Sequence, residues 1–270
     1  MASVTDVVFF SGGVSSWAAA KRVAEKYGTE NLKLLFTDTL IEDEDLYRFL
    51  REAAEDVGGE LVWIKEGRTP WEVFRDVKML GNSRVDPCSR ILKREIAQKW
   101  VRENYPDPDS VRLWLGMNWD EEHRLVRARR YWDPYQVGSL LMESPWLSQP
   151  QLLESLSKAG IEMPRLYKLG FPHNNCGGGC IKAGHAHFRH LLKNLPEVYA
   201  EWEKKEQEMR DYLDKDVSIL RDRSGGTVTP LTLKQLRERE DSDCELFDWG
   251  GCGCFAVSEE EDEKDGEDSP

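Results

Sequence analysis

The chain has 270 residues, a formal net charge of −13 and a hydrophobic content of 40%. These values are those of a globular protein with its own core, and they exclude a fibrous or wholly disordered chain. No apolar run approaches the ~18 residues of a membrane-spanning helix, and the N-terminus lacks the basic and apolar regions of a signal peptide. We therefore expect a cytoplasmic protein without a membrane partner, whose six cysteines bind metal or react rather than form disulfides.

The first predicted element is a strand followed by a turn and a helix. Residues 7–10 are apolar and predict a short buried strand, and residues 18–22 begin a strong helix-forming run. The turn between them lies at the carboxyl end of a strand and under a helix N-terminus, where α/β proteins bind phosphate. Gly12 and Gly13 would allow positive φ and a close backbone approach to a ligand. The predicted phosphate contacts are the turn's backbone amides and three hydroxyls, those of Ser11, Ser15 and Ser16. An ordinary strand-to-helix turn is the alternative.

Strands and helices then alternate along the chain. Further strands are predicted at residues 32–36, 61–64 and 111–117, and an amphipathic helix at residues 42–57. This alternation predicts a parallel sheet with helices on both faces, a Rossmann-like α/β fold. Asp38 follows the second strand, where it would meet a ribose or a bound magnesium ion, or cap the next helix.

Basic residues follow two of these elements. Cys88 opens a helix, and a thiol at a helix N-terminus tends to ionise. Arg90, Lys93 and Arg94 lie within one turn of each other, so they form either a phosphate- or sulfate-binding cluster or a solvated basic face. After the fourth strand, Arg124 is placed to reach the same cleft as the first turn.

The cysteines form a second pattern. Three glycines separate Cys176 from Cys180, and Cys252 and Cys254 form another glycine-spaced pair. An iron–sulfur cluster takes four thiolates, which Cys88, the first pair and one member of the second pair would supply. Structural zinc is the alternative, with His173 or His185 in reserve. Cys244 is expected to pack as a small buried hydrophobe.

Two sets of residues carry a family resemblance. Ser11-Gly12-Gly13-Val14-Ser15-Ser16 resembles the S-G-G-x-x-S pyrophosphate loop of the adenine nucleotide α-hydrolase (PP-loop) superfamily. Residues 145–147, 151–153 and 164–171, which lead into Cys176, are similar to the corresponding segments of the phosphoadenosine-phosphosulfate reductase-like branch. The resemblance covers about residues 7 to 182. It departs at Ser15, where many relatives carry Asp. It also departs from the adenylyl sulfate reductases at the single Cys88, where they have two adjacent cysteines, and at Cys176 and Cys180, which are separated by three residues rather than two.

The resemblance implies an enzyme that binds ATP or a related adenine nucleotide with Mg²⁺. It would adenylate a substrate at the α-phosphate, release pyrophosphate and transfer sulfur at a Cys-ligated centre, a 4Fe–4S cluster or Zn²⁺. The acceptor would be a nucleic acid or a small molecule, and the sulfur would come from a donor protein. The implied nucleotide-binding residues are Ser11, Gly12, Gly13, Ser15, Ser16 and Asp38; the implied catalytic residues are Ser11, Ser16, Asp38, Lys93 and Arg124; the implied metal ligands are Cys88, Cys176, Cys180, Cys252 and Cys254.

Two alternatives remain open at this point. A sulfonucleotide reductase would share this order of motifs, although its E-C-G-[IL]-H segment is absent from the sequence. A non-catalytic nucleotide-binding module with structural zinc would also fit, and Ser15 favours it.

The chain divides into three predicted parts. Residues 1–145 form the nucleotide-binding α/β domain, and residues 146–257 form a helical, cysteine-bearing part of the same globule. Helices are expected at residues 196–214 and 231–240. Residues 258–270 are acidic and form a tail expected to be disordered.

Overall fold

A five-stranded parallel sheet lies at the centre of the computed structural model, which describes residues 4–223, 226–239 and 248–250. Its strand order is β3-β2-β1-β4-β5. The strands are β1 (Thr5–Phe9), β2 (Leu32–Asp38), β3 (Glu60–Lys65), β4 (Val111–Trp114) and β5 (Gln136–Gly138). The parallel α/β fold predicted from the sequence is confirmed. The edge strand β5 was not predicted, because three residues are too few to show a period.

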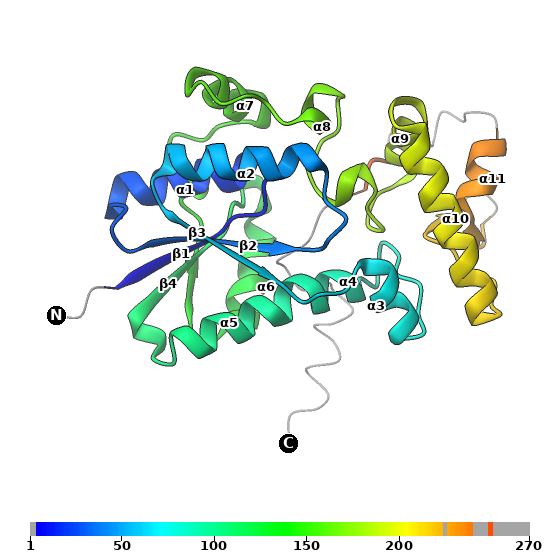
Figure 1. The fold of residues 1–270 in the computed structure, drawn as a ribbon, viewed down its shortest axis with the longest axis horizontal. Coiled ribbons are helices and arrows are strands. Elements are labelled where there is room, and N and C mark those ends of the chain that lie inside the picture. Colours follow the sequence, from blue (N-terminus) through cyan, green and yellow to red (C-terminus); the bar gives the residue numbers. More distant parts are fainter. Residues whose placement is uncertain (1–3, 224–225, 240–247, 251–270) are drawn as a thin grey trace.

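Helices cover both faces of this sheet (Figure 1). One face carries α1 (Val14–Tyr27), α2 (Glu44–Val57) and α7 (Gln149–Lys158), and the other carries α5 (Ile96–Asn104) and α6 (Glu122–Trp132). Residues 7–10 alternate between the two faces of the sheet. Val8 and Phe10 pack in the core under α1, α2 and α7, whereas Val7 and Phe9 pack in the core under α5 and α6. Burial on both faces explains why this segment is a continuous apolar run.

A third core lies beside the sheet and joins the C-terminal helices. Figure 1 shows α9, α10 and α11 together at one side of the molecule, next to α3. The elements are α3 (Pro70–Asp76), α9 (His185–Asn194), α10 (Pro196–Leu213), α11 (Leu233–Glu238) and the antiparallel hairpin of β6 (Leu220–Asp222) and β7 (Thr229–Leu231). The long helix predicted at residues 196–214 is confirmed as α10.

Short helical turns complete the described chain. Cys88 lies in α4 (Pro87–Ser89), which continues through a π-helical turn, η1 (Arg90–Glu95), into α5. The other turns are η2 (Pro108–Ser110), η3 (Trp119–Glu121), η4 (Leu140–Met142), α8 (Arg165–Lys168) and η5 (Cys176–Gly178). Among the helices described, none has the length and apolar character required to cross a bilayer.

Candidate functional site

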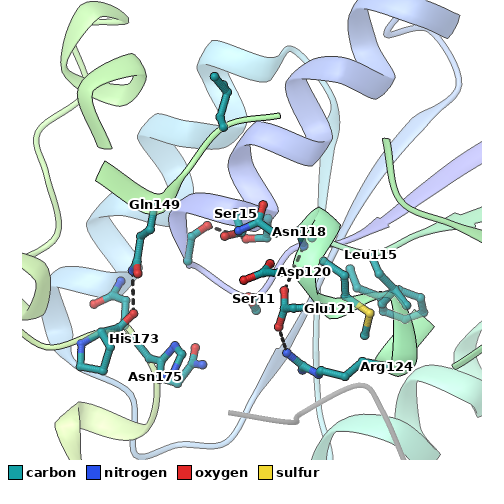
Figure 2. A pocket seen from close by; sticks show the side chains of 18 of the residues that line it. Ser11, Ser15, Leu115, Asn118, Asp120, Glu121, Arg124, Gln149, His173 and Asn175 are labelled. Carbon is teal, nitrogen blue, oxygen red and sulfur yellow. Dashed lines mark hydrogen bonds and ion pairs between the residues drawn. The ribbon is translucent and has the colours of Figure 1, made fainter. Parts of the chain in front are cut away.

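A cavity of about 430 Å³ opens at the carboxyl ends of the neighbouring strands β1 and β4. The strand that follows β1 in the chain lies on one side of this pair, and the strand that follows β4 lies on the other. This is the position at which open α/β sheets bind ligands. Four residues of the predicted phosphate loop, defined as residues 11–16, line the cavity: Ser11, Gly13, Ser15 and Ser16. Arg124 lines it from α6, as predicted, and Figure 2 shows it with Ser11 and Ser15 around the same space. The structure therefore brings the phosphate loop and Arg124 to the same cavity.

The two glycines of the phosphate loop have different conformations. Gly12 has φ +79°, and a Cβ at this position would lie 2.8 Å from Cγ of the buried Leu46. Gly13 has φ −96°, so the expectation of positive φ at both glycines is wrong for Gly13. Gly13 is the N-cap of α1, and extended backbone is the usual N-cap conformation. The loop thus directs the N-terminus of α1 at the cavity.

Hydrogen bonds within the loop fix its hydroxyls and amides. Ser16 Oγ donates to the Gly13 carbonyl at 2.7 Å, and the Ser16 amide donates to the same oxygen at 3.1 Å. The carboxyl end of β4 packs closely on this turn, because a Cβ on Gly116 would lie 2.8 Å from the Ser16 backbone nitrogen. Positions 16 and 116 therefore brace the helix N-terminus against the neighbouring strand.

The opposite wall comes from a distant part of the chain. The Val14 amide donates to Tyr167 Oη at 3.2 Å, and Asn174 Nδ2 donates to the Gly12 carbonyl at 2.8 Å. Both side chains line the cavity. The sequence alone assigns them no role; the L-Y-x-x-G segment around Tyr167 is its only signal, and nothing local indicates the contact with residue 14.

The carboxylates near Arg124 were also not predicted. Glu121 forms an ion pair with Arg124 and accepts from the Asn118 amide at 2.9 Å. Asp120 is exposed on the cavity wall, and no described residue pairs with it. Figure 2 shows Asp120 beside Ser11 and Glu121. The cavity thus offers donors at the phosphate loop and a carboxylate across from them.

Asp38 lies outside the lining of this cavity. It is buried and accepts three hydrogen bonds, from the Leu40 amide at 2.8 Å, Tyr47 Oη at 3.0 Å and Trp63 Nε1 at 3.1 Å. Burial and the bond to Asp38 raise the pKa of Tyr47. The N-cap of α2 is Asp43 rather than Asp38. In the described structure the Asp38 carboxylate therefore holds the turn after β2 through the Leu40 amide, and it also bonds to the side chains of Tyr47 and Trp63.

The three described cysteines meet in a second, much smaller cavity. Cys88, Cys176 and Cys180 line a space of about 20 Å³ together with Lys93, and we call it the thiol pocket. A hydrogen bond with the Cys180 thiol, and then burial, raise the pKa of Cys176 well above its ordinary value. The Cys176 thiol is therefore protonated near neutral pH, in contrast to the thiolate expected for Cys88 from its helix position.

The predicted basic cluster on the Cys88 helix is divided among different carboxylates. Lys93 is buried and lies 3.6 Å from Glu42, and Arg94 is buried 3.7 Å from Asp86. Arg90 is exposed and pairs with Glu95 at 2.8 Å. Neither a joint phosphate-binding cluster nor a solvated basic face describes all three side chains, because Lys93 and Arg94 are buried beside carboxylates and only Arg90 is exposed. Lys93 lies in the thiol pocket and is absent from the lining of the nucleotide-sized cavity.

Packing accounts for the glycines between Cys176 and Cys180. Gly177 and Gly178 have φ of +59° and +88°, and a Cβ on Gly177 would lie 2.8 Å from the Ile41 carbonyl oxygen. A Cβ on Gly179 would lie 2.3 Å from the Trp202 ring. Cys176 itself has φ +54°, which is uncommon for a residue with a side chain. These packing contacts are sufficient to explain the glycines, and a bound metal is not needed to explain them.

The histidines of α9 hold backbone carbonyls. His187 Nε2 lies 2.7 Å from the Gly178 carbonyl, and His185 Nε2 lies 3.1 Å from the Arg221 carbonyl. Burial lowers the pKa of His187 to about 4, so the ring is neutral and donates to Gly178. His173 lines the larger cavity. His185, named as a reserve zinc ligand, bonds to a backbone oxygen instead.

The described residues supply three of the four ligands that the expected metal centre needs. They bring three thiols to the thiol pocket, whereas a cluster and structural zinc both take four ligands. A space of about 20 Å³ holds roughly one water molecule, since one probe sphere takes ~10–15 Å³. In the described ranges, no group of three or more His, Cys, Asp or Glu side chains is arranged to hold a metal ion. Cys244, Cys252 and Cys254 lie outside these ranges, as does the predicted acidic tail.

Comparisons with known proteins give distant similarities. No family model matches the chain. A curated relative, the uncharacterized protein MJ0066 of Methanocaldococcus jannaschii, is 25% identical over 215 residues, which are 77% of this chain and 42% of the relative. The chain thus spans less than half the length of that relative.

Among the solved structures that are similar to this chain are two enzymes. A phosphoadenylyl-sulfate reductase from Candida auris is 16% identical, with a TM-score of 0.44, over 63% of this chain and 79% of that one. An NH3-dependent NAD synthetase from Campylobacter jejuni is 12% identical, with a TM-score of 0.40, over 79% of this chain and 86% of that one. Similarity at these scores assigns no activity to this chain.

Proposed function

We propose that this chain is a phosphoadenosine-phosphosulfate reductase-like enzyme of the PP-loop superfamily that binds ATP or a related adenine nucleotide and acts at its α-phosphate. The observation that carries the proposal is the phosphate loop, which lines a cavity of about 430 Å³ under the N-terminus of α1. A helix N-terminus offers amide donors and a positive dipole end, both of which favour an anion. The cavity has the volume of a small-molecule site.

The residues of the cavity have complementary roles in this proposal. The amides at the start of α1 and the hydroxyls of Ser11 and Ser15 hold the pyrophosphate oxygens. Arg124, at the rim of the same cavity, exchanges part of its ion pair with Glu121 for the α-phosphate. Donors fixed in place before the reaction stabilise charge that develops on the phosphate oxygens at little reorganisation cost.

The reaction is an adenylation followed by sulfur transfer. An acceptor oxygen attacks the α-phosphorus, the bond to the β-phosphate oxygen breaks, and pyrophosphate leaves. Hydrosulfide delivered by a donor protein then attacks the activated carbon, and the carbon–oxygen bond to AMP breaks as AMP leaves. The position of the thiol pocket supports sulfur transfer at this site. Cys176 lines the thiol pocket, and the preceding residue, Asn175, lines the larger cavity. The acceptor is a nucleic acid or a small molecule.

Asp120 is the residue that we propose for Mg²⁺. The loop has Ser15 where many PP-loop relatives carry Asp, so it lacks that carboxylate. Asp120 supplies a carboxylate on the wall of the same cavity, without a described partner. Carboxylate and phosphate oxygens are the ligands that Mg²⁺ prefers. Asp120→Asn should raise the Mg²⁺ concentration needed for half-maximal ATP binding, and an unchanged requirement would exclude this role.

Pyrophosphate release from ATP tests the proposal. Ser11→Ala should reduce this release by at least about tenfold if its hydroxyl contributes ~1.4 kcal/mol to the transition state. Ser110→Ala is the matched control, because its hydroxyl bonds to the Asp107 carbonyl far from the cavity. ATP binding without pyrophosphate release, with any acceptor fraction from cell extract, would leave the non-catalytic nucleotide-binding module with structural zinc. Absence of ATP binding by the wild type would reject both the enzyme and the module.

Sulfonucleotide reduction ranks second. The order of motifs favours it, but the sequence lacks the E-C-G-[IL]-H segment that carries the nucleophile of these reductases. Thioredoxin-dependent sulfite release from an adenylyl sulfate would reverse this order.

The proposed metal centre needs Cys252 or Cys254 as its fourth ligand. No step of the reaction described above requires the metal. Iron and zinc analysis of protein purified without oxygen tests for this centre. Metal that is lost in the Cys252→Ser/Cys254→Ser variant would support the ligand set named from the sequence, and metal-free, colourless protein would remove it.

A further inference from the structure

One segment of the chain contacts both the phosphate loop and the thiol pocket. Tyr167 and Asn174 bond to the phosphate loop, and Cys176 follows Asn174 by two residues. The contacts span 153 and 162 positions in the sequence, so they are tertiary links rather than local turns. Residues 172–176 thus separate the larger cavity from the smaller one.

Asn174 is well placed to transmit a change at the phosphate loop. Its side chain is 1% exposed, and its Nδ2 bond to the Gly12 carbonyl is buried. Gly12 is the residue of the loop with φ in the left-handed region, which L side chains rarely adopt. A ligand that fixes the loop amides therefore also fixes the carbonyl that Asn174 contacts.

The other end of the segment is held just as firmly. The Cys176 amide donates to Glu42, whose side chain accepts from Thr39 Oγ1 at 2.8 Å. Gly177 packs against the Ile41 carbonyl. Cys176 has positive φ, which residues with a side chain rarely adopt. The thiol loop, residues 176–180, thus begins two residues after the side chain that bonds to the Gly12 carbonyl.

We propose that Asn174 couples nucleotide binding at the phosphate loop to the accessibility of the Cys176 and Cys180 thiols. This inference rests on the proposed nucleotide binding. Nucleotide in the larger cavity holds the thiol loop closed, and release of nucleotide frees it to open. Coupling between two sites is reciprocal, so a modified thiol loop also binds nucleotide more weakly. The enzyme would thereby expose its thiols only when the phosphate loop is empty.

Alkylation rates of individual cysteines test the coupling. The probe is iodoacetamide, with peptide mass mapping, and the nucleotide is α,β-methylene ATP with Mg²⁺ at a concentration that titration shows to be saturating for each variant. In the wild type, nucleotide should slow alkylation of Cys176 and Cys180 by about fivefold or more, the lower end of typical coupling. In Asn174→Ala this protection should disappear.

Two further variants separate coupling from loss of folding. Asn174→Asp keeps the side-chain shape, but its carboxylate cannot donate to the Gly12 carbonyl, so it should lose protection as well. Asn104→Ala is the matched control, because Asn104 Nδ2 donates to the Trp100 carbonyl at 2.8 Å in α5. It should keep wild-type protection.

The outcomes distinguish this inference from the proposed function. Nucleotide binding without any protection in the wild type would overturn the coupling and leave the proposed function intact. Full protection in both Asn174 variants would show that Asn174 is not the link. A wild type that binds no nucleotide would reject the proposed function and this inference with it.

Discussion

At the scale of single residues, the phosphate loop depends on glycine at position 12 for two separate reasons. Its φ of +79° is unfavourable for other residues, and its missing Cβ leaves room for Leu46. Gly58 isolates the first reason, because it has φ +80° in the left-handed region and a Cβ there would make only an ordinary contact, 3.4 Å from Thr29 Cγ2. The sequence indicates such a turn, but it cannot distinguish the conformations of Gly12 and Gly13.

Gly12→Ala is therefore expected to destabilise the protein more than Gly58→Ala. A left-handed alanine costs ~1–2 kcal/mol, and the overlap with Leu46 adds to this only at position 12. Urea unfolding of both variants measures the difference. Equal losses of unfolding free energy would show that Leu46 yields without cost.

Glu206 gives a residue-level prediction about pH. Burial raises its pKa to about 7, although its two oxygens accept from the Ile219 and Leu233 amides at 2.9 and 2.6 Å. Between pH 4.5 and 7 the folded state then holds a proton that the unfolded state has lost. The contribution of this group to stability therefore falls as pH rises through that window, by as much as about 3 kcal/mol.

The measurement is the free energy of unfolding of the wild type minus that of Glu206→Gln, from pH 4.5 to 8. The difference should decrease with rising pH. A subtraction is needed because His187, with its pKa lowered to about 4, gives stability that is lost as pH falls below 6.5, which is the opposite slope. A difference that stays constant over the range would contradict the burial of an uncharged Glu206.

At the scale of elements, the sequence indicates most of the sheet and little of the cavity's far wall. The β1–turn–α1 unit, β2, β3 and α10 follow from local patterns of apolar residues, and β4 is predicted three residues too long. Tyr167 and Asn174 reach the loop across more than 150 positions, and no local pattern predicts such a contact. The same limit explains Lys93, whose partner Glu42 lies in the loop between β2 and α2.

The thiol loop and α10 are joined by a contact that permits no side chain. A Cβ on Gly179 would lie 2.3 Å from the Trp202 ring, and Trp202 is buried in the third core. Gly179→Ala should therefore displace α10 and lower the melting temperature by several degrees, as a loss of roughly 1–3 kcal/mol does in a domain of this size.

Trp202→Leu provides the control for this contact. It should recover part of the loss caused by Gly179→Ala, because the smaller side chain leaves space for the new methyl group. Additive effects of the two substitutions in a double-mutant cycle would show that the two positions do not interact.

At the scale of the whole molecule, the sheet order places two sites on one side of the fold. The strand order runs outward in opposite directions from β1 and β4, and the larger cavity opens between their carboxyl ends. The loop after α8 carries Cys176 and Cys180 from the wall of this cavity to the Cys88 helix. The order of motifs predicts convergence of Cys88, Cys176 and Cys180, and the structure brings them together. Their small separation and the hydrogen-bonded thiols follow from side-chain packing, which the spacing of cysteines does not reveal.

The most direct test of the account is a calorimetric titration of the full chain with α,β-methylene ATP and Mg²⁺. We predict one binding site per chain in the wild type and none in Gly13→Val, whose side chain would enter the space beside Tyr167 Oη, 3.3 Å from a Cβ at position 13. The melting temperature without nucleotide should be the same for both proteins. Absence of binding by the wild type, or equal affinity in Gly13→Val, would contradict the assignment of residues 11–16 as the phosphate site.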